Sequence, residues 1–199
     1  MERYICLKCG RCCHEVKGAI DDPTYKRIPL YPEEADRLEA LAKERNIPLR
    51  IIEDVVFPDI KNQKILVLTW RVLLDNEGQV CPFHSPDVGC TIHNKKPLAC
   101  KAYPLAIKTE DAFNMTINID PLCKFTEMNR ELLEKIEFDK LKEVYDIEYG
   151  LAMDLLKRNK HAIMELRAKE ALGQIEIPKT ISSDDFDKYL KEWDRITLD

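Results

Sequence analysis

The stretch Cys6-Leu7-Lys8-Cys9-Gly10-Arg11-Cys12-Cys13 places four of the chain's eight cysteines within eight positions. The other four follow a gap of 67 residues without cysteine, and they are Cys81, Cys90, Cys100 and Cys123. A soft metal centre needs several deprotonated sulfur atoms that approach one another, and closely spaced cysteines provide them. The pattern predicts a metal-thiolate protein in which the second group of cysteines closes over the first.

The composition indicates a soluble, folded protein. The chain has 199 residues, of which 45% are hydrophobic and 34% charged, enough apolar material for the core of one medium domain. It contains no apolar run long enough to cross a bilayer, and its first residues lack an apolar signal region, so we expect no membrane partner and a cytoplasmic location. In a reducing cytosol such cysteines are more often ligands than disulfides. The Lys, Glu and Ile bias resembles that of thermophiles, whose intracellular proteins can carry disulfides, so that alternative stays open.

The charge distribution argues against a nucleic-acid partner, because the net charge is −5 and phosphate binding needs a basic face. Residues 1–125 carry 18 acidic and 18 basic side chains, whereas residues 126–199 carry 18 and 13. The lysines near the cysteines could balance thiolate charge, or they could be ordinary solvated surface residues.

Local patterns predict an α+β fold. We expect a loop over residues 1–20, a connection over 21–30, a helix over 32–46, strands over 51–57 and 64–74, a turn at 75–78, and a short strand that leads to Cys81. Prolines and a glycine predict irregular loops over 82–102, around Cys90 and Cys100. A hairpin is expected over 103–119, as a strand at 103–108 and another at 112–119.

Charged helical sequence follows the last cysteine. We expect helices over 126–138 and 139–172 with a break at Gly150, a stop at Gly173, a short strand at 174–177 and a last helix capped by Ser183. The predicted fold is therefore a small antiparallel sheet with irregular cysteine-bearing loops closed around a metal centre, plus a helical C-terminal region. The domains are 1–125, which binds metal, and 126–199, which is separate or packed into the same unit.

Iron–sulfur and zinc are the two candidate cofactors, and the spacing of the cysteines favours iron modestly. Cys6, Cys9 and Cys12 repeat the spacing of the first three cysteines in the bacterial ferredoxin run. In that run three residues separate the third cysteine from the fourth, whereas here Cys13 follows Cys12 directly. Zinc suits the first Cys-x-x-Cys-Gly turn, yet the paired Cys-x-x-Cys that a zinc site would need later in the chain is absent. In an extended chain the vicinal pair Cys12 and Cys13 would point to opposite sides and serve two metals.

Three histidines are further candidate ligands, because each lies one to three residues after a cysteine: His14, His84 and His93. An exposed polar loop residue is the alternative interpretation for each of them. His161 lies in the late helical sequence, where a surface position is expected.

Several pieces of the chain resemble the YkgJ-type CxxCxxCC cysteine-cluster family. They are the Cys6–Cys13 run, Cys81-Pro82-Phe83, Gly89-Cys90-Thr91-Ile92, the stretch from Lys96 to Pro104 that holds Cys100, and Cys123. The resemblance covers roughly residues 4–125. It implies that the metal-binding signature comprises Cys6, Cys9, Cys12, Cys13, Cys81, Cys90, Cys100 and Cys123, and that the metal is zinc or the iron of an iron–sulfur cluster.

The chain departs from the usual family pattern at four positions. Lys96 and Lys101 stand where the family usually has arginine, and His84 and His93 stand where it usually has leucine and tyrosine. Lysine balances thiolate charge equally well but would hold a bidentate anion less well. Residues 126–199 lie outside the resemblance.

Three functional hypotheses follow. The favoured one is an iron–sulfur protein in electron transfer or redox sensing, which as an enzyme would be an oxidoreductase and would have a redox partner. The second is a zinc-stabilised module that binds a protein partner. The third is a metal-dependent modifying enzyme, because a lysine N-methylase shares the cysteine signature. The six glycines are scattered and form no nucleotide-binding loop, and no catalytic residue could be assigned.

Overall fold

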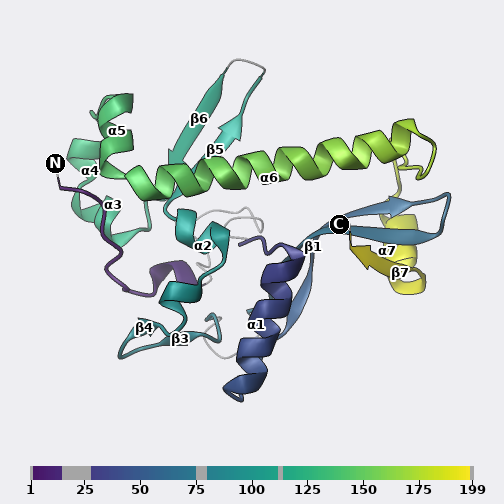
Figure 1. The fold of residues 1–199 in the computed structure, drawn as a ribbon, viewed down its shortest axis with the longest axis horizontal. Coiled ribbons are helices and arrows are strands. Elements are labelled where there is room, and N and C mark those ends of the chain that lie inside the picture. Colours follow the sequence, from purple (N-terminus) through teal and green to yellow (C-terminus); the bar gives the residue numbers. More distant parts are fainter. Residues whose placement is uncertain (1, 15–27, 75–79, 112–113, 198–199) are drawn as a thin grey trace.

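The computed structural model describes residues 2–14, 28–74, 80–111 and 114–197. It combines helices with small sheets, so the α+β prediction is confirmed. Helix α6 (Asp146–Ala171) runs across the molecule, and the other elements are arranged along its length on both sides of it (Figure 1). Its 26 residues span roughly 39 Å, because each helical residue adds about 1.5 Å.

Helix α1 (Pro32–Glu44) confirms the first predicted helix. Proline occupies the first helical position, where its missing N–H costs nothing, and Glu33 and Glu34 lie at the positive end of the helix dipole. Leu38 and Leu41 are buried and pack with Phe83 and Ile92 from the cysteine-bearing region. Helix α1 therefore supports one side of that region.

Strands β1 (Ile51–Asp59) and β2 (Lys64–Val72) confirm the two predicted strands, and they pair with each other in antiparallel orientation. Strand β7 (Asp194–Thr197) lies parallel to β2 and was not predicted. The strand is short and starts with two charged residues, so it carries no period-2 signal. Helix α7 (Ser183–Glu192) precedes it, and its N-cap is Ser182, which accepts a hydrogen bond of 3.1 Å from the N–H of Asp185. The prediction that Ser183 is the cap was wrong by one residue, and the predicted turn at 75–78 lies outside the described residues.

The cysteine-bearing region is more regular than the sequence predicted. It contains the short strands β3 (His84–Ser85) and β4 (Gly89–Cys90), the 3-10 turn η2 (His93–Lys95) and helix α2 (Leu98–Ala102). Cys100 therefore lies on a helix, which begins directly after Pro97. Val80, directly before Cys81, forms an antiparallel bridge with His14, and the rest of the short strand predicted to lead to Cys81 lies outside the described residues.

The predicted hairpin is confirmed by β5 (Leu105–Thr109) and β6 (Met115–Ile119). The four helices that follow are α3 (Lys124–Met128), α4 (Arg130–Leu133), α5 (Phe138–Val144) and α6. The expected break at Gly150 is wrong, because Gly150 lies inside α6 and the chain bends at Tyr145, whose side chain is completely buried.

The predicted end of the helix at Gly173 is confirmed, whereas the strand predicted directly after it is not found among the described residues. Gly173 adopts a φ of 65°, a left-handed conformation that terminates the helix. Residues 174–177 form no strand within the described chain, although Ile60 donates a backbone hydrogen bond of 2.9 Å to Glu176.

Helix α6 contacts both ends of the molecule. Near its start, Tyr145 and Ala152 pack with Ala102 of α2 and Leu105 of β5. Near its end, Leu166 packs against Leu66 of β2. The division into residues 1–125 and 126–199 stays a prediction. Across the described ranges, no helix has the length and apolar character needed to cross a membrane.

Candidate metal centre

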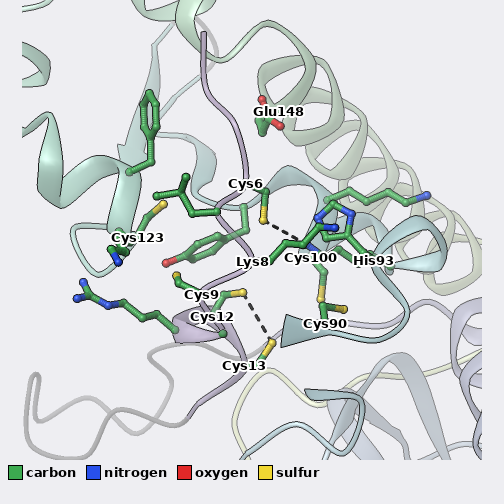
Figure 2. Close-up of a pocket in the computed structure, with 18 of the residues that line it drawn as sticks. Cys6, Lys8, Cys9, Cys12, Cys13, Cys90, His93, Cys100, Cys123 and Glu148 are labelled. Carbon is green, nitrogen blue, oxygen red and sulfur yellow. Dashed lines mark hydrogen bonds between the residues drawn. The ribbon is translucent and has the colours of Figure 1, made fainter. Parts of the chain in front are cut away.

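The two cysteine groups meet at one cavity of about 220 Å³ (Figure 2). Seven cysteines line it: Cys6, Cys9, Cys12, Cys13, Cys90, Cys100 and Cys123. Cys81 lines a neighbouring cavity of about 390 Å³, which Cys12 and Cys13 also line. All eight cysteines are free thiols. The fold thus brings together residues that are far apart in the sequence.

A tight turn shapes the N-terminal run. Gly10 adopts a φ of 76°, and the 3-10 turn η1 (Arg11–Cys13) closes with a hydrogen bond of 2.7 Å from the N–H of Cys13 to Gly10. The vicinal pair is therefore not extended, and its two sulfur atoms lie 3.9 Å apart. The expectation that Cys12 and Cys13 point to opposite sides is wrong, because the turn rotates both thiols to the same side.

Backbone contacts hold the second group against the first. The N–H of Cys81 donates a hydrogen bond of 2.7 Å to the carbonyl of Cys13. Gly89 has a φ of 71°, and a Cβ atom there would lie 2.2 Å from the carbonyl oxygen of Lys8. Only a residue without a side chain allows this approach, so the β3–β4 hairpin closes directly onto the N-terminal run.

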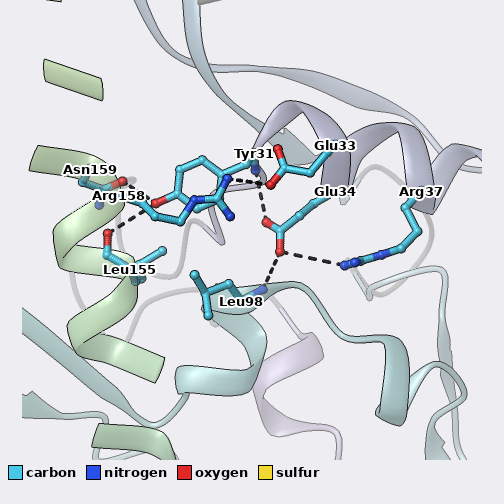
Figure 3. A network of polar contacts seen from close by, with 8 residues as sticks. All are labelled: Tyr31, Glu33, Glu34, Arg37, Leu98, Leu155, Arg158 and Asn159. Carbon is cyan, nitrogen blue, oxygen red and sulfur yellow. Dashed lines mark hydrogen bonds and ion pairs between the residues drawn. The ribbon is translucent and has the colours of Figure 1, made fainter. Parts of the chain in front are cut away.

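Glu34 positions the helix that carries Cys100 (Figure 3). This buried carboxylate accepts hydrogen bonds from the N–H of Tyr31 at 3.1 Å and from the N–H of Leu98 at 2.7 Å. It therefore satisfies one free N–H at the start of α1 and one at the start of α2. The Tyr31 hydroxyl in turn donates to Asn159 of α6 at 2.8 Å. Sequence reasoning missed Glu34, because its two partners belong to different helices.

Aromatic residues enclose the side of the cavity near Cys123, which is buried. The ring of Tyr4 lies 5.1 Å from that of Phe125 and 5.2 Å from that of Tyr145. The N–H of Tyr4 donates to the carbonyl of Val144 at 2.7 Å. The N-terminal run is therefore anchored to α5 just before its first cysteine.

The protein environment disfavours the ionised thiol at three of these positions, Cys13, Cys90 and Cys100. Burial raises the pKa of Cys100 well above its ordinary value, and it also raises the pKa of Cys90. Hydrogen bonds with Cys12 and Cys81, together with burial, raise the pKa of Cys13, and the same contact with Cys13 lowers the pKa of Cys81. Several neighbouring thiolates thus need a compensating positive charge, which a bound metal supplies.

Lys96 supplies one protein cation. Its side chain is buried, with a relative exposure of 8%, and its ammonium nitrogen lies 3.7 Å from the sulfur of Cys6. For Lys96 the interpretation as a solvated surface residue is wrong. Other basic side chains line the same cavity: Lys8, Arg11, Lys101 and Lys124.

The histidines differ in their surroundings. The rings of His14 and His84 lie 5.0 Å apart in an edge-to-face contact, whereas His93 lines the cysteine cavity. Burial is the main cause that lowers the pKa of His93, which favours the neutral ring. His161 is exposed and faces Glu165 at 3.5 Å, as expected for a surface residue.

The donor atoms fit a metal-thiolate group in their chemistry, since thiols, an imidazole and nearby cations surround one cavity. Within the described residues, no group of three or more histidine, cysteine, aspartate and glutamate side chains is gathered closely enough for one ion. The thiols are instead distributed around the cavity.

Comparison with protein families decides the identity of this region. Residues 5–124 match the family model CxxCxxCC, described as "Putative zinc- or iron-chelating domain". The chain belongs to the CxxCxxCC family. The family resemblance in the sequence is therefore confirmed, and membership supports metal binding by zinc or iron. No curated protein and no solved structure matches this CxxCxxCC chain.

Proposed function

We propose that the protein binds an iron–sulfur cluster through its cysteines and acts in electron transfer or redox sensing. The seven cysteines around one cavity carry this proposal. A structural zinc ion takes four ligands that converge on one point. A cluster contributes its own iron and sulfide, so its thiolate ligands surround a volume. Seven thiols distributed around about 220 Å³ support a group of this kind.

The position of the cavity near the surface supports a redox role. Cys9 is exposed, and Leu7, two residues before it, has a relative exposure of 46%. Both residues line the cavity. A group held there would lie close to the surface on which a redox partner could dock, and the chain's own residues would hold and orient it.

Zinc is the second candidate, and one distance favours it. Two thiolates on a tetrahedral zinc ion lie about 3.8 Å apart, because each Zn–S bond is about 2.3 Å. The sulfur atoms of Cys12 and Cys13 are 3.9 Å apart. Eight thiolates could form two zinc sites that stabilise a protein-binding module.

Purification without oxygen, followed by a visible spectrum and analysis of iron, zinc and sulfide, distinguishes the two candidates. We expect a brown protein that contains iron and acid-labile sulfide and is bleached by a reductant. A colourless protein with stoichiometric zinc would refute the cluster and establish the second candidate.

Variants of the cysteines connect the metal with the cavity. Cys100→Ser and Cys9→Ser are expected to lower the iron and sulfide content. Val88→Ser is the matched control, because Val88 is exposed in the loop between β3 and β4. A cysteine whose replacement leaves the metal content unchanged does not belong to the ligand set.

A further inference from the structure

His93 is a nitrogen donor at the cysteine cavity. It begins the turn η2, three residues after Cys90. Its imidazole lines the cavity on the side where Cys90 and Cys100 lie (Figure 2). Among the neutral side chains that line the cavity, cysteine and histidine are the two residue types that commonly bind both zinc and iron.

The Nε2 atom of His93 is buried and has no hydrogen-bond partner within the described part of the chain. A buried polar atom without a partner is costly in a folded protein and calls for an explanation, such as an absent ion. The Asn94 side chain forms a hydrogen bond with the imidazole, and since Nε2 has no partner, we assign that bond to Nδ1. This arrangement is typical of ligating histidines, whose second nitrogen is held by a neighbouring polar group.

The other two histidines near the cysteines have different contacts. His84 is packed so closely against Gly10 that a Cβ atom on Gly10 would lie 2.0 Å from the Nε2 of His84. His14 packs against the His84 ring and lines the neighbouring cavity. The geometry therefore selects His93 from the three candidates.

We propose that Nε2 of His93 is a ligand of the metal group, in a mixed set of imidazole nitrogen and cysteine sulfur. The inference rests on the proposed function, and it applies to iron and to zinc alike. A neutral imidazole brings less negative charge than a thiolate, so a histidine ligand raises the reduction potential of an iron–sulfur group.

X-ray absorption at the edge of the bound metal tests the proposal in the full-length protein. We expect the wild type to show imidazole nitrogen at about 2.0 Å in addition to sulfur at about 2.3 Å. His93→Ala is expected to lose the nitrogen signal. His93→Cys is expected to keep the metal with sulfur ligands alone and, if the metal is iron, to have a lower reduction potential. His161→Ala is the matched control, because His161 is exposed on α6.

Two outcomes overturn the proposal, and they are distinguishable. A metal-loaded wild type that shows sulfur alone, with a spectrum unchanged in His93→Cys, refutes the histidine ligand and leaves the proposed function intact. A wild type that binds neither iron nor zinc after reconstitution refutes both. If His93→Ala fails to fold, the wild-type spectrum and His93→Cys still decide the question.

Discussion

The buried carboxylate of Glu34 in α1 accepts a hydrogen bond of 2.7 Å from the backbone N–H of Leu98, which is 64 residues away at the start of α2. Its second oxygen accepts from the N–H of Tyr31. One side chain therefore satisfies N–H groups at the starts of two helices, and the second helix carries Cys100. The position of this cysteine depends on a residue outside both cysteine groups.

Replacing Glu34 by glutamine is expected to lower the free energy of unfolding by about 2 kcal/mol, because hydrogen bonds to a charged acceptor contribute about 1.5–3 kcal/mol. The amide has one acceptor oxygen and cannot serve both N–H groups as the carboxylate does. We also expect lower metal retention, since α2 would be less well held. Urea unfolding and metal analysis measure the two effects.

The adjacent Glu33→Gln variant is the control. Glu33 is exposed and forms an ion pair with Arg158, and exposed ion pairs contribute about 0.2–1 kcal/mol. If both variants lose the same free energy of unfolding, the two hydrogen bonds that Glu34 accepts at the starts of α1 and α2 do not contribute measurably to stability.

Local sequence patterns predicted the elements that depend on local contacts. Helix α1, the strands β1 and β2 and the β5–β6 hairpin have the residue patterns of their type, and the sequence predicted each of them. Strand β7 was missed because it is stabilised by pairing with β2, 130 residues earlier in the sequence at Lys64 and Asp194.

The candidate site was predictable in its residues but not in its geometry. The family resemblance implied a signature of all eight cysteines, yet nothing in the sequence indicated that seven of them line one cavity and that Cys81 lines the neighbouring one. Helix α2 was missed because its five residues are too few for a periodic pattern and it is stabilised by Glu34. The burial of Lys96 likewise depends on the folded arrangement.

Gly89→Ala is expected to disrupt the junction between the two cysteine groups. The new Cβ would lie 2.2 Å from the carbonyl oxygen of Lys8, and the backbone φ of 71° is itself unfavourable for alanine. We expect a fall in thermal stability and in metal content together, which thermal melting and elemental analysis measure.

Gly150→Ala is the control for Gly89→Ala, because it adds the same methyl group at a position with space for it. Gly150 lies inside α6, and nothing described lies within 4 Å of the position of a Cβ atom there. Alanine is expected to stabilise this helix by about 0.5–1 kcal/mol without a change in metal content. If Gly89→Ala, like Gly150→Ala, lowers neither the thermal stability nor the metal content, the close approach of the β3–β4 hairpin to Lys8 is not needed for folding.

Lys96→Met is expected to weaken metal binding, because it removes the buried positive charge 3.7 Å from the sulfur of Cys6 while it keeps an unbranched side chain. Lys96→Arg preserves the charge and should retain more metal. Lys95→Met controls for the loss of charge alone, since Lys95 is exposed. Competition with a chromophoric chelator measures the affinities, and equal affinities for Lys96→Met and Lys95→Met would remove Lys96 from the site.

Metal binding is expected to release protons and to strengthen as the pH rises. Burial raises the pKa of both Cys90 and Cys100, so at neutral pH, below the ordinary thiol pKa of about 8.5, these groups are protonated in the metal-free protein. Each must lose its proton to become a ligand, and the logarithm of the affinity should therefore rise by about one per pH unit for each such thiol. Calorimetric titration of the metal-free protein with Zn²⁺, in buffers of different ionisation enthalpy, counts the protons released. Cys90→Ser and Cys100→Ser should each release about one proton fewer, and an affinity that is independent of pH would exclude both thiols as ligands.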